Sequence, residues 1–279
     1  MDPLRIVTIN TGKCDGPYQA RVAWLAEEVA RLRPDVLVCQ EVFREDAGPR
    51  DTLSTLQRKL GLQASWAPAR FKLRECEGVA LNGWSGMGLL SRYAWAYVDV
   101  LELPADDRDG ERVAQIALLE VGETSVVVAN VHLTHLRDGD KLREAQLDSV
   151  LRHPLMQMRK AIRLICGDLN TTPENPLLSR MLKNREAGSL IDTYVHGHGE
   201  AERGTLPPRG NTPAGRPCVD YILSVADSEE NQPVFTSSAV VLRNRDPRSG
   251  TLPSDHYGVA TTLVPLRVPG WRGERTLVG

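Results

Sequence analysis

The stretch MGLLSRYAWAYVDVLELPADDRDGERVAQIALLEVGETSVVVANVHL (residues 87–133) decides the fold class, because it holds several β-like runs and no helical pattern between them. Turn signals at Asp109-Gly110 and at Gly122 separate the later runs. Strands that follow one another without an intervening helix pair antiparallel, so this stretch predicts a meander. The runs are 87–91, 96–103, 112–121 and 125–133.

Toward the N-terminus, strands and helices alternate. Residues 4–10 form a β-like run, and apolar residues then recur at helical spacing over 22–32. The near-continuous apolar run 36–43 is typical of a strand buried on both faces. A second helix is expected over 52–60. Residues 63–86 are weakly patterned and contain three glycines, so they predict a surface excursion.

Toward the C-terminus, the same order of strand, acidic strand end, loop and helix returns. A charged helix is expected over 141–152, a strand over 163–170, and a helix after Thr172-Pro173-Glu174. Residues 196–217 are rich in Gly, Pro and Arg, which predicts a loop. The last expected strands are 218–225, 237–243 and 257–265.

The fold class follows from this order of elements. Strands outnumber helices by roughly two to one and several are consecutive, which favours an α+β sandwich with mixed sheets over a doubly wound parallel sheet. No low-complexity linker and no repeat of about 20–50 residues divides the chain. We therefore expect one domain over residues 1–279.

Composition limits the function classes. The 34 basic and 36 acidic residues give a net charge of −2, so no overall cationic field holds nucleic acid without local contacts. The five cysteines are scattered and show no zinc-ligand spacing, which indicates a reducing compartment. The N-terminus resembles neither a signal nor a transit peptide, and no run approaches about 18 apolar residues. We expect a cytoplasmic protein without membrane insertion, and a monomer.

Polar residues gather at the ends of the expected strands. Strand ends meet at one rim of a sheet, where carboxylates and amides supply oxygen ligands for Mg²⁺ and imidazoles supply donors for a phosphoryl oxygen. This collection indicates metal-assisted hydrolysis of a phosphoester. Its members are Asn10, Glu41, His132, Asp168, Asn170, Asp220, Asp255 and His256.

Some members also have an ordinary structural interpretation. Asn10 precedes Thr11-Gly12, where a turn residue is common. His132 alone is more often a satisfied core histidine than a catalytic one. Asp255-His256 could form a turn with a charge pair.

Other members favour function more strongly. Glu41 follows an apolar run, and a partly buried carboxylate is usually paired or metal-bound. Asp168 and Asn170 are two residues apart, so a strand directs both side chains to one face, although a turn with an N-cap asparagine is the alternative. Asp220 lies within a strand and needs a buried partner, for which a histidine is the obvious candidate.

The motifs over residues 8–259, taken in their order along the chain, resemble those of the endonuclease/exonuclease/phosphatase superfamily, which includes deoxyribonuclease I-like enzymes. The resemblance implies a four-layer α/β/β/α sandwich of two mixed β-sheets with the active site at one rim. The motifs that carry it are TINT (Asn10), CQEV (Glu41), GMGLLSR (86–92), NVHL (His132), GDLNTTP (Asp168 and Asn170), VDYI (Asp220) and SDHYGV (Asp255 and His256).

The resemblance also implies roles. Glu41 would be the main ligand of Mg²⁺ or Mn²⁺, with Asn10 and Asp255 close to the metal. Asp168 would orient or deprotonate the attacking water, and Asn170 would hold that water and the phosphate.

Three further residues would contact the phosphoryl group. His132 and His256 would donate to its oxygens, with Asp220 polarising the ring of His256. Arg112 matches a substrate-binding position.

Several substrates remain open. A nuclease-like phosphodiesterase acting on DNA or RNA is favoured, and some motifs look like tyrosyl-DNA phosphodiesterase. A phosphoesterase acting on a small metabolite or lipid head group is an alternative, and so is a non-catalytic binding domain. Two groups of arginines could contact a phosphate backbone or could belong to solvated loops: Arg203, Arg209 and Arg216, and Arg243, Arg245 and Arg248.

Overall fold

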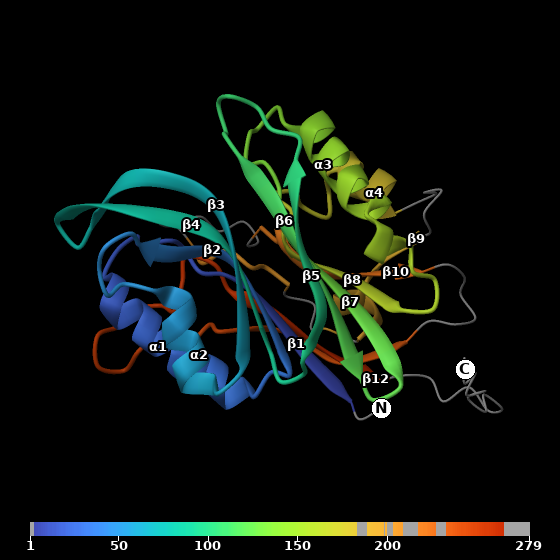
Figure 1. Ribbon diagram of the computed structural model, residues 1–279, viewed down its shortest axis with the longest axis horizontal. Coiled ribbons are helices and arrows are strands. Elements are labelled where there is room, and N and C mark those ends of the chain that lie inside the picture. Colours follow the sequence, from blue (N-terminus) through green and yellow to red (C-terminus); the bar gives the residue numbers. More distant parts are fainter. Residues whose placement is uncertain are drawn as a thin grey trace, which may run out of the picture.

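Two six-stranded β-sheets form the centre of the computed structural model (Figure 1). Each sheet holds one parallel pair of strands and is otherwise antiparallel. The first sheet runs, in spatial order, β11 (Val234–Val241), β12 (Gly258–Val264), β1 (Leu4–Asn10), β2 (Val36–Glu45), β4 (Val79–Ser91) and β3 (Gln63–Cys76). The second runs β5 (Trp95–Leu103), β6 (Arg112–Val121), β7 (Thr124–His132), β8 (Ile162–Asp168), β10 (Asp220–Ala226) and β9 (Ser189–Asp192). The structure describes residues 3–182, 189–197, 199, 203–208, 217–226 and 233–264.

Helices cover the outer faces of both sheets, which confirms the expected four-layer sandwich. Helices α1 (Tyr18–Leu32) and α2 (Thr52–Leu60) pack on the first sheet. Helix α3 (Asp140–Arg152), the 3₁₀ turn η1 (Pro154–Gln157) and α4 (Pro176–Leu182) pack on the second. A short helix, α5 (Thr193–His196), follows β9.

Alternation along β1 shows how the layers are held together. Leu4 and Ile6 point into the core between the sheets, whereas Val7 and Ile9 point into the core under α1 and α2. Because successive side chains of a strand face opposite sides, a strand that is apolar throughout must be central and covered on both faces.

One expectation about the fold is wrong. Residues 63–86 are not a surface excursion, because β3 and β4 pair as a long antiparallel hairpin that extends one end of the first sheet (Figure 1). The apolar run 87–91 is only the last part of β4. Backbone hydrogen bonds form β3, an edge strand with many exposed side chains, and its sequence lacks the continuous apolar signal of a central strand.

Other parts of the chain also differ from the sequence predictions or lie outside the described residues. Residues 189–196, to which no element was assigned from sequence, form β9 and α5. Much of the expected loop 196–217 lies outside the described residues. All five cysteines are free and buried. In the described part of the chain, no helix is both long enough and apolar enough to cross a bilayer.

Candidate active site

Strand register in the second sheet places three polar side chains next to one another. His132 at the end of β7 pairs with Asp168 at the end of β8, and Asp168 pairs with Asp220 at the start of β10. Both aspartates are 1% exposed. Three strands that are distant in sequence therefore deliver an imidazole and two carboxyl groups to one rim.

The first sheet contributes Asn10 and Glu41 to the same rim. Asn10 ends β1, and its Nδ2 donates to Asp168 Oδ2 over 3.1 Å, which links the two sheets. Glu41 lies in a β-bulge of β2 and has φ +52°. Such a conformation is uncommon outside glycine and is concentrated at functional sites. The Glu41 carboxylate forms an ion pair of 2.6 Å with Lys13 Nζ.

Asp168 is the centre of the cluster. Its Oδ1 accepts the backbone N–H of Asn170 at 2.9 Å. Its Oδ2 lies 3.5 Å from His132 Nε2 and 4.0 Å from His256 Nε2, beside the Asn10 amide. Burial raises the pKa of the Asp168 carboxyl above its ordinary value. A carboxylate with a raised pKa is a better proton acceptor than an exposed one.

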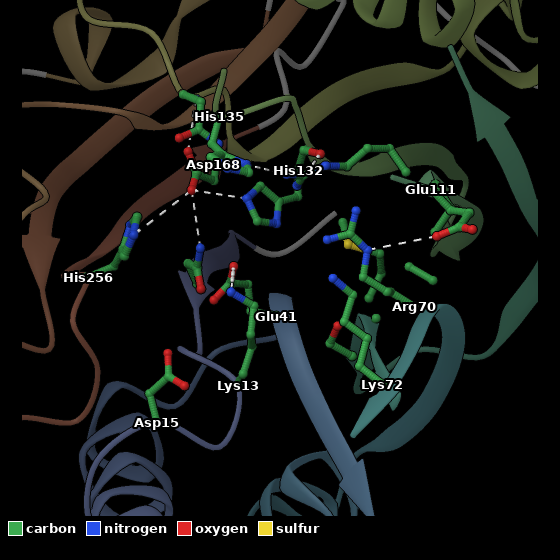
Figure 2. Close-up of a pocket in the computed structure, with 18 of the residues that line it drawn as sticks. Lys13, Asp15, Glu41, Arg70, Lys72, Glu111, His132, His135, Asp168 and His256 are labelled. Carbon is green, nitrogen blue, oxygen red and sulfur yellow. Dashed lines mark hydrogen bonds and ion pairs between the residues drawn. The ribbon is translucent and has the colours of Figure 1, made fainter. Parts of the chain in front are cut away.

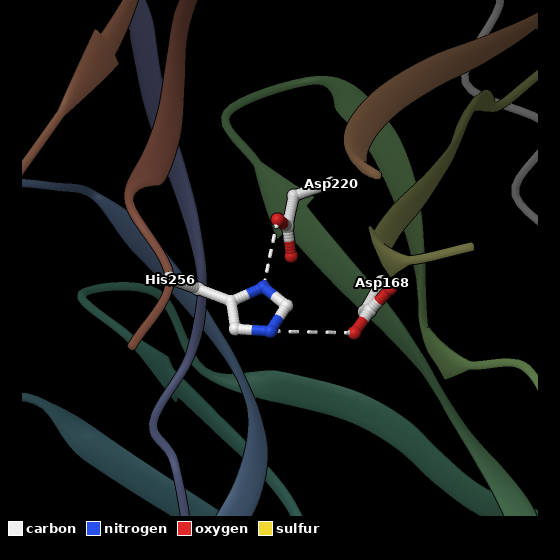
Figure 3. A group of neighbouring side chains, drawn as sticks. All are labelled: Asp168, Asp220 and His256. Atoms are coloured by element: carbon white, nitrogen blue, oxygen red, sulfur yellow. Dashed lines mark hydrogen bonds and ion pairs between the residues drawn. The ribbon is translucent and has the colours of Figure 1, made fainter. Parts of the chain in front are cut away.

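Partly buried His256 and fully buried Asp220 form a pair (Figure 3). Nδ1 of His256 lies 2.9 Å from Asp220 Oδ2. Burial alone would lower the pKa of His256, but the carboxylates of Asp220, Asp168 and Asp255 together outweigh it and raise the pKa to about 10. At neutral pH the ring is therefore protonated, Nδ1–H donates to Asp220, and Nε2–H points toward Asp168.

His132 has the opposite charge state. Burial lowers its pKa well below the ordinary value, and the nearby positive charge of Arg112 adds to that effect. The ring is therefore neutral at physiological pH and carries one N–H. The cleft thus combines a neutral imidazole with a protonated one.

Asn170 and Asp255 also line the cleft. Asn170 has φ +48°, and its Nδ2 donates to the Leu133 carbonyl at 2.9 Å, so a backbone oxygen fixes its amide. Asp255 is exposed, and its Oδ1 accepts from Ser254 Oγ at 3.3 Å. A side chain at Gly12 would crowd Asp255, since an added Cβ would lie 2.8 Å from its Oδ1.

Arg112 reaches the cleft through a partner that sequence analysis missed. Its guanidinium donates twice to Asp109, at 2.6 and 3.1 Å, and Asp109 is 1% exposed. The same carboxylate lies 2.8 Å from Nδ1 of His135, a ring that is 59% exposed and lines the cleft. Asp109 therefore positions both an arginine and a histidine. The sequence places Asp109 in a turn signal, which did not indicate that it would hold these two side chains.

We expect Asp109→Asn to destabilise the protein by about 3 kcal/mol, because it leaves the nearly buried Arg112 guanidinium without its counter-charge. Asp138→Asn is the matched control, since Asp138 pairs with Arg108 but is 68% exposed. Urea unfolding of the three proteins measures the effect. Equal free energies of unfolding for the two variants would contradict a structural role for Asp109.

The cleft has a volume of about 600 Å³ and a basic wall that sequence analysis did not predict. Lys13, Arg70, Lys72 and Arg74 line it. Figure 2 shows Arg70 and Lys72 across the cleft from Asp168 and His256. Arg70, Lys72 and Arg74 belong to β3 and lie in residues 63–86, the stretch that was expected to be a surface excursion.

Uncharged polar residues beneath the cleft were also missed. Gln40 and Asn130 are fully buried, and Gln40 Nε2 donates to Asn130 Oδ1 at 2.8 Å, so the pair joins β2 to β7. Each interrupts an apolar run, and this signal could have identified them. Buried Arg21 donates to backbone carbonyls of residues 11–13 and so holds the loop that carries Lys13.

The two arginine groups suggested by sequence do not line this cleft in the described part of the chain. Arg203 pairs with Asp192 at 2.5 Å, and Arg248 pairs with Asp246 at 3.1 Å. Arg243 stacks on an aromatic ring, and Arg245 donates to a backbone carbonyl. Arg209 and Arg216 lie outside the described residues.

Two sets of side chains have donors suitable for a metal ion. Asn10, Glu41 and Asp255 offer oxygen atoms to one cleft, and the Lys13 ammonium beside Glu41 shows that this position attracts a cation. This set fits a hard divalent ion such as Mg²⁺.

The second set is Asp168, Asp220 and His256, whose candidate atoms lie within 4.8 Å of one another. Asp220 Oδ1 has no hydrogen-bond partner among the described residues. However, a protonated imidazole has no lone pair for a metal, so a hydrogen-bonded relay describes this group better.

Comparison with known proteins gives one family and several similar structures. The model of the Endonuclease/Exonuclease/phosphatase family matches residues 7–256. No curated protein sequence matches the chain.

Three solved structures illustrate the shared fold. An endonuclease/exonuclease/phosphatase from Beutenbergia cavernae is 23% identical with a TM-score of 0.73, over 94% of this chain and 72% of that one. The human Nocturnin catalytic domain with bound sulfate is 22% identical with a TM-score of 0.72, over 95% of both chains. TDP2 from Caenorhabditis elegans is 19% identical with a TM-score of 0.70, over 94% of this chain and 74% of that one.

Proposed function

The chain belongs to the endonuclease/exonuclease/phosphatase family, and from this premise we propose that it is a metal-dependent phosphoester hydrolase, with a nuclease-like phosphodiesterase activity. The observation that carries the proposal is the line of contacts from Asp220 through His256 and Asp168 to Asn10, which crosses both sheets at the cleft. A binding domain that had lost catalysis would not need this set of buried titratable groups.

Each residue has a chemical task in this proposal. Asp168, buried and with a raised pKa, accepts a proton from the attacking water. His256 is protonated and donates Nε2–H to a phosphoryl oxygen, while Asp220 holds its ring. The neutral His132 donates its single N–H from the other side of Asp168.

The remaining residues would bind and orient. Asn170, whose amide is fixed by a backbone carbonyl, holds the water and the phosphate. Arg112 contacts the substrate from the wall that Asp109 supports. Mg²⁺ or Mn²⁺ bound by Glu41, with Asn10 and Asp255 nearby, would supply positive charge to the phosphoryl group.

A phosphodiester in a nucleic acid is the favoured substrate class. The cleft is lined by five cations, Lys13, Arg70, Lys72, Arg74 and Arg112, and this local positive charge suits a phosphodiester backbone. The similar structures include TDP2, and that of Nocturnin binds a sulfate anion. A panel of single-stranded DNA, double-stranded DNA, 5′-blocked DNA, RNA and small phosphomonoesters would separate these substrates.

The metal requirement gives a direct test. We expect excess EDTA to abolish hydrolysis and added Mg²⁺ or Mn²⁺ to restore it, because the oxygen donors of Asn10, Glu41 and Asp255 suit hard ions. Tm should change by no more than a few degrees, since the apolar cores between the layers do not include the site. Hydrolysis that continues in EDTA would contradict the proposal.

A further inference from the structure

Strand β3 carries a row of cations on the face that looks into the cleft. A β-bulge shifts its pairing with β4 between Pro68 and Arg70. A bulge adds one residue and so changes which side chains face each side of the strand. After the bulge, Arg70, Lys72 and Arg74 line the cleft. Without it, the alternation would present the intervening apolar residues to the cleft instead.

The opposite face of β3 differs in character. Phe71 is 45% exposed and Leu73 is 70% exposed, and Phe71 packs against Trp84 of β4. Charges on an edge strand also prevent pairing between sheet edges, but that purpose does not require a particular face. Here the three cations of β3 all line the cleft, where a ligand would lie.

These cations form few direct ion pairs, although carboxylates such as Asp15, Glu41 and Glu111 line the same cleft. Arg70 pairs with Glu111 at 3.8 Å, but Glu111 is 78% exposed, so solvent screens the pair. Arg74 Nη2 donates to the neutral Ser85 Oγ at 2.9 Å. In the part of the chain that the structure describes, neither Lys72 nor Arg74 forms an ion pair with a carboxylate. Like charges held close together favour an anion between them.

The electrostatics of Lys72 agree with this description. The neighbouring Arg70 charge lowers the pKa of Lys72, burial, Arg74 and Lys13 add to the effect, and only Glu111 opposes it among the charges of the described residues that act on Lys72. Lys13 is the partner of Glu41, so the row of positive charge continues to the proposed metal ligand. A bound anion would relieve this repulsion.

The spacing on β3 suggests a repeating anion. Alternate residues of a strand are roughly 6.6 Å apart, which is comparable to the separation of successive phosphates along a nucleic acid strand. We infer that Lys72 and Arg74 bind further phosphates of the substrate, next to the phosphate that is hydrolysed. The inference rests on the proposed function and refines it, because the substrate must then be a molecule with more than one phosphate.

Three substrates with the same reacting ester test the inference. The first is the p-nitrophenyl ester of thymidine 5′-monophosphate, which has one phosphate. The second carries an additional 3′-phosphate, and the third is extended at the 3′ end to an oligothymidylate. The release of p-nitrophenol gives kcat/KM for each in Mg²⁺.

The variant is Lys72→Gln combined with Arg74→Gln, and the matched control is Arg58→Gln combined with Lys59→Gln. Arg58 and Lys59 are exposed on α2, on the outer face of the sheet, so the control loses the same charge away from the cleft. In the β3 variant, we expect the preference for multi-phosphate over single-phosphate ester to fall about tenfold or more. The salt dependence of log(kcat/KM) for the oligothymidylate should weaken by about 1.4 logarithmic units per decade, for two lost contacts.

The comparison also identifies the source of the phosphate. If one 3′-phosphate provides the full preference, the substrate is a small bisphosphorylated molecule. If the preference is larger for the oligothymidylate than for the 3′-phosphorylated ester, the substrate is a nucleic acid strand. A ratio and salt slope that are the same in the β3 variant and the control would overturn the inference while the proposed function stands.

A binding assay covers the remaining outcome. If no ester is hydrolysed, the proposed function fails, and fluorescence anisotropy with a labelled oligothymidylate in EDTA then tests the inference alone. Binding that weakens about tenfold in the β3 variant and not in the control supports it. Equal dissociation constants for the two variants, or no binding by the unmodified protein, contradict it.

Discussion

His256→Ala is expected to lower kcat by about 10²-fold or more, since that is the effect of removing one donor that stabilises charge in a transition state. The ring is protonated because of Asp220, and its Nε2–H points toward Asp168 at the cleft. Alanine removes the donor without adding a new group. Steady-state kinetics at saturating metal measure the loss.

Asp220→Asn should cost nearly as much as His256→Ala. An amide at position 220 removes the negative charge that keeps the imidazole protonated and oriented through the 2.9 Å contact. The double variant should resemble the single ones, because a misplaced ring and an absent ring deprive the transition state of the same hydrogen bond. Rate losses that multiply in the double variant would reject the pair as a functional unit.

Stability distinguishes this pair from a structural one. His153 and Asp99 form a similar contact at 3.1 Å that does not belong to the cleft, so His153→Ala is the matched control. The His153→Ala variant should have a lower Tm and an unchanged kcat. If Asp220→Asn instead lowers Tm while kcat stays within about twofold, Asp220 is a structural acid and its role in the proposed function is wrong.

Much of the candidate site's location could be predicted from sequence because polar residues at the ends of apolar runs are a local signal. His132 and Asp168 each end a strand and Asp220 begins one, and the register of β7, β8 and β10 makes them neighbours. That register depends on pairing between distant segments. The sequence could therefore name these residues and His256, but not the 2.9 Å contact of His256 with Asp220 or the 3.5 Å contact of His132 with Asp168.

The β-bulges were not predictable in the same way. Glu41 is turned by a bulge in β2, and Arg70 and Lys72 by one in β3. A bulge is fixed by how a strand pairs with its neighbour, here β4, rather than by the composition of the strand. The alternating letters RFKLR of residues 70–74 did carry a two-residue period, but without a partner strand they look like a charged loop.

Asp168→Asn is expected to lower kcat by about 10³-fold at saturating Mg²⁺, within the range of losses found when a positioned base is removed. The amide keeps the shape of the side chain, but it cannot accept a proton from water. The substitution should change the metal concentration for half-maximal rate by no more than about threefold, because the Asp168 carboxylate already contacts Asn10, Asn170 and the histidines.

Glu41→Gln should mainly weaken metal binding rather than lower the maximal rate. It serves as the comparison for Asp168→Asn. Its carboxylate already attracts the Lys13 ammonium at 2.6 Å, so removing the charge should raise the metal concentration for half-maximal rate about tenfold or more. Excess metal should then recover much of the rate in Glu41→Gln and almost none in Asp168→Asn. Metal titrations that coincide for the two variants would mean that both carboxylates bind the ion, and the assignment of Asp168 as the proton acceptor would then be wrong.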